Sequence, residues 1–308
     1  MTTTPSSSFL NNIVNQFALP DCKYYTNDEF NSNFSKVPKI NKLSLFHLNI
    51  RSLNANKDKL VQLLASVNNP FDVIVLTEIC VYNIDFYSNL FPDFSFFYNL
   101  PHDSKVGGVG MYIHNSYQAT VIYNGSKEDS DNHFENIIIE LTKNECKFVV
   151  CGVYRHPSYL LTNFNKIFED FLVQHFNKLI NNDCWILADF NADISKYNNI
   201  SEITLFLDNL LNLNFLPLIT LPTRITKTSS TILDHIYLRP ALNNKSSNIN
   251  TSNLNVGCLV TDITDHIGIF SFLTLDKKRD VVNKERPLVR IFSKSNKNKF
   301  NYELANID

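Results

Sequence analysis

A set of polar residues in this sequence stands directly beside short apolar runs, where a β-strand would end or begin. Its members are Asn49, Glu78, Asp189, Asn191, Asp265 and His266. Strand ends are rigid platforms from which side chains of several strands can converge on one place. This placement predicts one polar site built at the ends of several strands.

The residue types in this set suit the hydrolysis of a phosphate ester. A hard divalent cation such as Mg²⁺ prefers oxygen ligands, usually one or two carboxylates with water and substrate phosphate. An Asp-His pair can supply a base and charge stabilisation for an attacking water. Taken singly, a carboxylate at a strand end is more often a capping or surface residue. The residue types therefore indicate metal-assisted hydrolysis without specifying a substrate.

Hydrophobic periodicity predicts the elements that would carry these residues. Residues 43–48 and 72–77 have the pattern of buried strands, and the apolar residues between 60 and 67 have helical spacing. Further strands are predicted at 106–114, 118–123, 135–141, 147–154, 185–187, 232–238, 256–260 and 267–273, and helices at 159–179 and 202–213. Many strands and few helices favour an α/β fold, a four-layer sandwich of two packed, mostly antiparallel β-sheets flanked by helices.

Three regions follow from changes in composition along the chain. Residues 1–40 are polar and lack sustained periodicity, which predicts a flexible leader. Residues 41–276 carry the predicted domain, including an Asn/Ser-rich stretch at 241–255 that we expect to be a surface loop. Residues 277–308 are polar and basic, and we interpret them as a linker or tail.

The overall composition is that of an ordinary soluble globular protein. Hydrophobic residues make up 44% and charged residues 19%, so a packed core is expected. The net charge of -2 argues against binding nucleic acid by bulk electrostatics. It does not exclude a nuclease, because a carboxylate-rich metal site adds negative charge that its cation offsets.

Cysteine spacing and hydropathy indicate the compartment. The 6 cysteines show no CxxC pair or zinc-ligand spacing, which favours free thiols in a reducing compartment. The sequence has neither a secretory signal pattern nor an apolar run long enough to span a membrane. We therefore expect a soluble, intracellular, monomeric protein of the nucleus or cytoplasm, with no membrane partner and no small-molecule cofactor.

An ordered set of short segments carries a family resemblance. The segments are 47–53 (HLNIRSL), 76–78 (LTE), 107–112 (GGVGMY), 153–157 (VYRHP), 188–191 (ADFN), 222–224 (PTR), 233–236 (LDHI) and 264–266 (TDH). Over roughly residues 43–275 the chain resembles the endonuclease/exonuclease/phosphatase superfamily, whose fold is DNase I-like. Within that superfamily it looks most like the apurinic-type endonuclease domain of non-LTR retrotransposons of the LINE, CR1 and jockey kind.

The resemblance implies a metal site and a catalytic set. Glu78 would be the principal ligand of Mg²⁺, with Mn²⁺ as an alternative ion. Asn49 would orient the metal or the phosphate, and Asp265 would orient the metal's waters or contact the metal directly. The implied catalytic residues are Tyr154, Asp189, Asn191, Asp234 and His266.

Each of these implied catalytic roles has a structural alternative. Asp189 would position or deprotonate the attacking water, held by Asn191, although the two could instead form an Asx turn. Tyr154 would donate to the phosphate, although it could also be a core residue with its hydroxyl at the rim. His266 would pair with Asp234 and bind the phosphate oxygen whose charge grows during the reaction, although a His next to an apolar strand is often structural. His235 is assigned to packing, because adjacent strand residues point to opposite faces.

Weaker matches imply contacts to the DNA backbone. They are Arg155, Thr223, Arg224 and Thr231. A Pro-Thr-Arg loop could equally be a solvated turn. Position 51 is Arg where many repair-type relatives carry a carboxylate, which argues against a repair enzyme and leaves Glu78 as the main ligand.

The implied function is a Mg²⁺-dependent DNA endonuclease. It would nick one strand and leave a 3′-hydroxyl for target-primed reverse transcription, with the basic tail leading toward a reverse transcriptase that these residues do not contain. One alternative keeps the fold and changes the substrate to a phosphoinositide, sphingomyelin or poly(A). Another is a catalytically silent, domesticated nucleic-acid-binding protein. Target-site preference is not encoded in any list of side chains.

Overall fold

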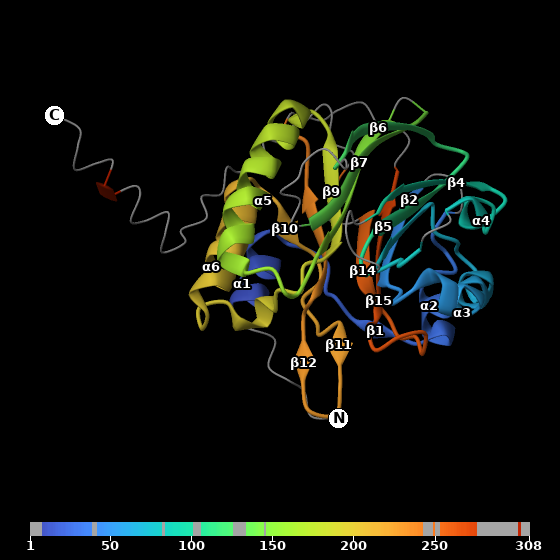
Figure 1. The fold of residues 1–308 in the computed structure, drawn as a ribbon, viewed down its shortest axis with the longest axis horizontal. Helices are drawn as coiled ribbons and strands as arrows, with labels where there is room; N and C mark the ends of the chain where they lie inside the picture. Colours follow the sequence, from blue (N-terminus) through green and yellow to red (C-terminus); the bar gives the residue numbers. More distant parts are fainter. Residues whose placement is uncertain are drawn as a thin grey trace.

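A computed structural model describes residues 8–38, 42–81, 84–100, 106–125, 134–144, 146–242, 249, 253–275 and 301–302. Two β-sheets pack face to face between two outer layers of helices (Figure 1). This arrangement confirms the predicted four-layer α/β sandwich. The predicted tail at 277–308, apart from 301–302, and most of the predicted loop at 241–255 lie outside the described residues.

The first sheet has seven strands. In spatial order they are β1 (Tyr24–Tyr25), β14 (Leu254–Leu259), β15 (Gly268–Thr274), β2 (Lys42–Asn49), β3 (Val73–Thr77), β5 (Val109–His114) and β4 (Phe94–Asn99). The pairs β1–β14 and β2–β3 are parallel, and the other pairs are antiparallel.

The second sheet has six strands. In spatial order they are β10 (Leu216–Pro217), β13 (Asp234–Arg239), β9 (Asp183–Asp189), β8 (Cys146–Arg155), β7 (Phe134–Lys143) and β6 (Gln118–Asn124). Only β8–β9 is parallel. A separate two-stranded hairpin, β11 (Arg224–Ile225) with β12 (Ser230–Thr231), projects from the end of the sandwich (Figure 1).

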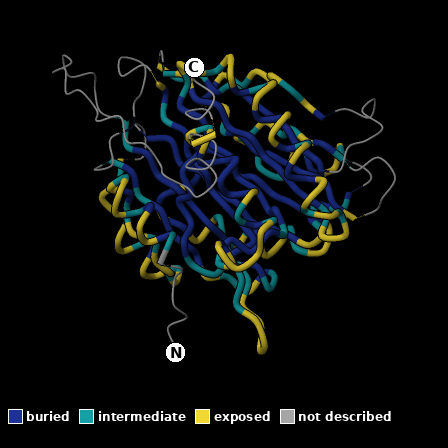
Figure 2. The backbone as a smooth tube through the Cα atoms, turned by 90° about the vertical axis from the view of Figure 1, so that its left-hand side faces the viewer, coloured by how far each residue is buried: buried dark blue, intermediate teal, exposed yellow. Residues whose placement is uncertain are grey.

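Helices bury the outer face of each sheet. On the first sheet lie α2 (Asn27–Asn33), α3 (Leu53–Ser66) and the short α4 (Asp85–Ser88); on the second lie α5 (Leu161–Phe176) and α6 (Ser201–Asn212). Short 3₁₀ turns lie at Asn177–Leu179, after α5, and at Ile194–Lys196, before α6. Apart from the edge strands β4 and β6, the long strands between these layers are almost entirely buried (Figure 2), so their ends are rigid supports for a site.

The structure corrects the predicted flexible leader. Residues 8–38 contain α1 (Ser8–Gln16), β1 and α2. Leu10 of α1 and Phe30 of α2 are fully buried, and β1 adds a parallel strand beside β14. The prediction failed because this segment has only a few apolar residues, and their burial depends on packing against the distant strands of the domain.

The strand predictions hold with local differences. The predicted strand 106–114 begins at Val109, since Gly107 and Gly108 adopt φ values of 118° and 89°, which lie outside the strand region. Strand β4 was not predicted. It is an edge strand whose residues are mostly half-buried or exposed, and its run of aromatic residues does not alternate regularly with polar ones.

Candidate active site

The strand registers bring the predicted site residues to one end of the sandwich. Asn49 ends β2 and pairs with Thr77, the last residue of the parallel strand β3, so Glu78 follows beside it. In the other sheet Tyr154 pairs with Asp189, and Asp189 pairs with Asp234. These registers place side chains from both sheets at a common edge, as the sequence predicted.

Asn49 links the two sheets. Its Nδ2 donates to Glu78 Oε1 at 2.9 Å and to Asp189 Oδ2 at 2.7 Å, and its Oδ1 accepts from the backbone N–H of Arg51 at 3.1 Å. Two carboxylate acceptors and one backbone donor fix which way the amide faces. Asn49 therefore orients Glu78 and Asp189, and its amide oxygen is turned to the backbone.

Tyr154 completes the link to Glu78. Its hydroxyl donates to Glu78 Oε1 at 3.0 Å, and the side chain is almost fully buried. Burial, and then the charge of Glu78, raise the pKa of the Tyr154 hydroxyl. The hydroxyl therefore remains a donor, able to turn from Glu78 to a phosphate oxygen.

Asp189 is fully buried at the centre of the site. Its Oδ1 accepts from the backbone N–H of Asn191 at 2.9 Å, while its Oδ2 is held by Asn49. Burial, reinforced by the nearby charge of Asp234, raises the pKa of the Asp189 carboxyl to about 7. A carboxyl group with a pKa near neutrality is suited to accept a proton from water.

Asp234 and His266 form a buried pair. His266 Nδ1 lies 2.8 Å from Asp234 Oδ2, and both side chains are almost inaccessible to solvent. Burial by itself would lower the pKa of His266, but the charge of Asp234 and the hydrogen bond to it raise it to about 9. Near neutral pH His266 is therefore a cation, which suits binding of an anionic phosphate oxygen.

His235 faces the opposite side of β13, as predicted. It is buried, its Nε2 lies 3.2 Å from the carbonyl of Ala192, and its ring packs near Phe190 and Tyr237. Burial lowers its pKa to about 4, so it is a neutral core residue.

The structure corrects the expected role of Arg155. The side chain is 4% exposed, and its guanidinium donates to the carbonyls of Phe190, His156, Tyr159 and, at 2.9 Å, Asn191. These acceptors fix the loop that carries Asn191, whose Nδ2 in turn donates to the carbonyl of Arg155 at 2.8 Å. Arg155 shapes the site from below and is not available to contact DNA.

Thr223 also proves to be structural. Thr223 is fully buried, and its Oγ1 accepts from the backbone N–H groups of Leu233 and Asp234 at 3.1 and 2.9 Å. Thr231 is half-buried and pairs with Arg224 in the hairpin β11–β12. Thr223 thus positions Asp234 from behind, where DNA cannot reach it.

Asp265 lies between two arginines. Arg51 Nη1 is 2.9 Å from Oδ1, and Arg224 Nε donates to Oδ2 at 2.8 Å. Both carboxylate oxygens of this predicted metal residue therefore face guanidinium groups.

The donor set at Glu78 fits a hard divalent cation. Among the described residues, Oε1 of Glu78 receives two hydrogen bonds and Oε2 receives none, and the side chain is half-buried. Ligand atoms of Asp189, Asp234 and His266 also lie within 4.8 Å of one another. The hydrogen bond between His266 and Asp234 uses one atom of each and leaves Asp234 Oδ1 without a hydrogen-bond partner among the described residues, so both groups of residues offer ligand atoms.

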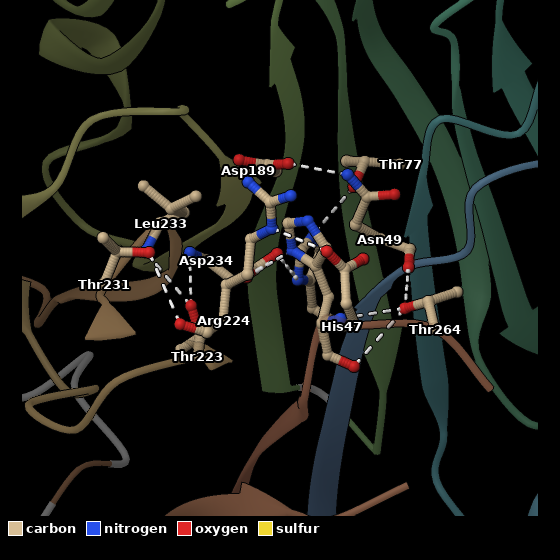
Figure 3. Close-up of polar contacts among 12 residues, drawn as sticks. His47, Asn49, Thr77, Asp189, Thr223, Arg224, Thr231, Leu233, Asp234 and Thr264 are labelled. Atoms are coloured by element: carbon tan, nitrogen blue, oxygen red, sulfur yellow. Dashed lines mark hydrogen bonds and ion pairs between the residues drawn. The ribbon is translucent and has the colours of Figure 1, made fainter. Parts of the chain in front are cut away.

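Sequence reasoning missed two supporting residues. His47 is fully buried, with Nε2 3.3 Å from Thr77 Oγ1 and Nδ1 3.8 Å from the free oxygen of Asp234. Thr264 Oγ1 donates to the carbonyl of Asn49 at 3.0 Å. Figure 3 shows both beside the site. Strand alternation gave a signal for His47, since it points to the same face of β2 as Asn49.

Comparison with known proteins identifies the family. The sequence matches the Endonuclease/Exonuclease/phosphatase family over residues 46–266. The match spans more than half of the chain, and the chain belongs to that family. Comparison with curated protein sequences gave no match.

Solved structures with the same fold differ in activity. The endonuclease domain of TRAS1, a telomere-specific non-LTR retrotransposon, is similar with a TM-score of 0.55 and 10% identity, over 76% of this chain and 100% of that one. An AP endonuclease from Archaeoglobus fulgidus is similar with a TM-score of 0.56 and 12% identity, over 76% of this chain and 100% of that one. A mannosyl-6-phosphatase from Bacteroides thetaiotaomicron is similar with a TM-score of 0.51 and 10% identity, over 74% of this chain and 98% of that one. At these identities the similarity establishes the DNase I-like fold alone.

Proposed function

We propose that this chain is a Mg²⁺-dependent DNA endonuclease that nicks one strand and leaves a 3′-hydroxyl and a 5′-phosphate. The observation that carries the proposal is the buried contact system at the strand ends, in which Asn49 joins Glu78 to Asp189 and His266 is paired with Asp234. It provides an acceptor for the proton of water and a cation for phosphate, the two requirements of phosphodiester hydrolysis.

Each side chain of the site has its own proposed role in the reaction. Asp189, fixed by Asn49 and the backbone of Asn191, orients the attacking water and accepts its proton. His266 binds the phosphate oxygen whose negative charge grows, while Asp234 holds the imidazole as a cation. Tyr154 donates its hydroxyl to the phosphate. A divalent cation held at Glu78 would supply further stabilisation of that charge.

Fold similarity supports a DNA substrate over a lipid one. The TRAS1 domain and the AP endonuclease are among the similar structures, and another is D. rerio TDP2 complexed with a single-strand DNA product. None of the helices among the described residues has the length and apolar character needed to cross a membrane. We further propose that the 3′-hydroxyl primes reverse transcription, as part of a retrotransposon protein.

The test is incubation of the purified chain with supercoiled plasmid in Mg²⁺ or EDTA. We expect nicked circles in Mg²⁺ only, and the nick should be extended by a DNA polymerase and sealed by a DNA ligase. Extension reports the 3′-hydroxyl, and sealing also requires the 5′-phosphate. Intact plasmid together with hydrolysis of a phosphoinositide would show that the substrate is a lipid.

A further inference from the structure

Two arginines at the edge of the site have free donors, unlike the other arginines that the structure describes. Arg51 and Arg224 have side chains 44% and 35% exposed. Arg155 and Arg239 are 4% and 5% exposed, and their guanidinium groups donate to backbone carbonyls. The arginines with a structural role are therefore buried, and those beside His266 are open to a ligand.

Asp265 pairs with both arginines but leaves most of their guanidinium N–H donors without an acceptor in the described part of the chain. Arg224 uses Nε on Asp265 Oδ2, and Arg51 lies close to Oδ1 in an ion pair that is not aligned as a hydrogen bond. No other side-chain acceptor for either guanidinium lies among the described residues. Two positive charges share one negative charge, so the group keeps a net positive charge and several free N–H donors.

The backbone fixes the direction of both side chains. Arg51 has a φ of 45°, a left-handed value that costs energy for a residue with a side chain. Flanking backbone hydrogen bonds from Ile50 to Thr77 and from Ser52 to Glu78 hold this loop against the metal-site loop. Arg224 forms a β-bridge with His266 itself. Each arginine is thus positioned from a segment that also carries a catalytic or metal residue.

We infer that Arg51 and Arg224 form an arginine clamp that binds a backbone phosphodiester of the nucleic acid next to the reacting phosphate, with Asp265 as its positioning residue. This inference rests on the proposed function. Guanidinium groups suit phosphate because their planar N–H donors match two phosphate oxygens at once. Asp265 holds the two side chains at the correct place before substrate arrives, so less conformational entropy is lost on binding. Asp265 is then not a metal ligand.

The test measures binding of a short DNA duplex to the full chain in EDTA over a series of NaCl concentrations. Arg51→Gln and Arg224→Gln should each weaken binding and lower the salt slope by about one, and the double variant by about two. Arg51→Lys should keep the slope, because it keeps the charge. Lys147→Gln is the matched control, since Lys147 is an exposed cation paired with Glu140 at the opposite end of β8. Wild-type slopes in both Gln variants would overturn the clamp.

Two further variants keep the result interpretable. Arg51→Gly suits the left-handed backbone and removes the guanidinium without strain, so it should reproduce the effect of Arg51→Gln. Asp265→Asn no longer holds the two arginines in place, so it should bind DNA more weakly than the wild type, while its affinity for Mn²⁺, measured by electron paramagnetic resonance, should equal that of the wild type. Loss of Mn²⁺ binding in Asp265→Asn would overturn its positioning role.

The clamp and the proposed function can fail separately. Nicking by the wild type with unchanged slopes in the arginine variants would leave the endonuclease proposal intact and overturn the clamp. DNA binding with the expected slope changes, but no nicking in Mg²⁺, would support the clamp and overturn the endonuclease proposal.

Discussion

Asp234 of β13 and Asp189 of β9 are direct cross-strand partners, both fully buried. Two like charges placed opposite each other would repel, so the pair must differ in protonation or in partners. The neighbouring groups give the two carboxyl groups different pKa values. Burial would raise the pKa of Asp234, but the His266 cation outweighs it and leaves that pKa lowered, whereas burial raises the pKa of Asp189 to about 7. This separation of pKa values supports the proposed roles, with Asp189 as the base and Asp234 as the partner of the His266 cation.

Glu78→Gln should abolish nicking while leaving the fold intact. The variant keeps an oxygen for Asn49 and Tyr154 but loses the negative charge that would hold a cation, so the nicking rate should fall at least ~100-fold. Mn²⁺ affinity should fall in parallel, and the melting temperature should change by only a few degrees. Glu140→Gln, at an exposed ion pair on β7, is the control. Near-wild-type nicking would show that Glu78 does not hold the metal.

His266→Ala should lower the nicking rate at least ~100-fold, as expected for loss of a group that stabilises transition-state charge. Asp234→Asn should act through the same imidazole, because it removes the carboxylate that keeps His266 charged. The double variant should therefore be little worse than His266→Ala alone. A double variant whose loss equals the product of the two single losses would mean that the residues act independently.

Asp189 should make the folded state sensitive to pH. Its pKa is raised from an ordinary value of ~3.9 to about 7. A carboxyl group whose pKa is raised on folding contributes stability at low pH, and this stability is lost as pH rises through the pKa of the folded state. In EDTA, the wild type should therefore lose unfolding free energy relative to Asp189→Asn as pH rises from 4 to 8, by an amount on the order of 3 kcal/mol. Urea denaturation at several pH values measures this, and a constant difference between the two proteins would contradict it.

Arg155→Gln should lower stability without changing the salt slope of DNA binding, whereas Arg224→Gln should change that slope with little effect on stability. Removing the buried guanidinium leaves backbone carbonyls without donors, which should cost about 2–4 kcal/mol of unfolding free energy. The salt slope of DNA binding by the remaining folded protein should not change. Arg224→Gln should alter that slope with a small effect on melting temperature. Thermal denaturation and anisotropy titrations on the two variants give the comparison directly.

Nick positions on a plasmid should favour flexible pyrimidine–purine steps over fixed base sequences. A nicking enzyme must deform the groove to bring one phosphate into a buried site, and these steps deform most easily. Sequencing of nicked products maps the positions. Cleavage spread evenly over all step types would remove the argument from DNA shape.

The sequence by itself determined where the chemistry lies along the chain. Apolar runs predicted the strands, and polar residues at their ends, such as Asn49, Glu78 and Asp189, predicted a shared site. The alternation of side chains along β13 correctly placed Asp234 toward the site and His235 away from it. These inferences succeed because strand periodicity and strand ends are local properties, readable within a few residues.

Only the tertiary structure decided which polar side chains face the substrate. Arg155, Thr223 and Arg224 looked equivalent as motif residues, yet the first two are buried beneath the site and only Arg224 is open. Arg51 and Asp265 come together from segments more than 200 residues apart. The reason is physical: whether a polar group binds a ligand or satisfies the backbone depends on which distant carbonyls and carboxylates pack against it, and long-range packing sets those neighbours.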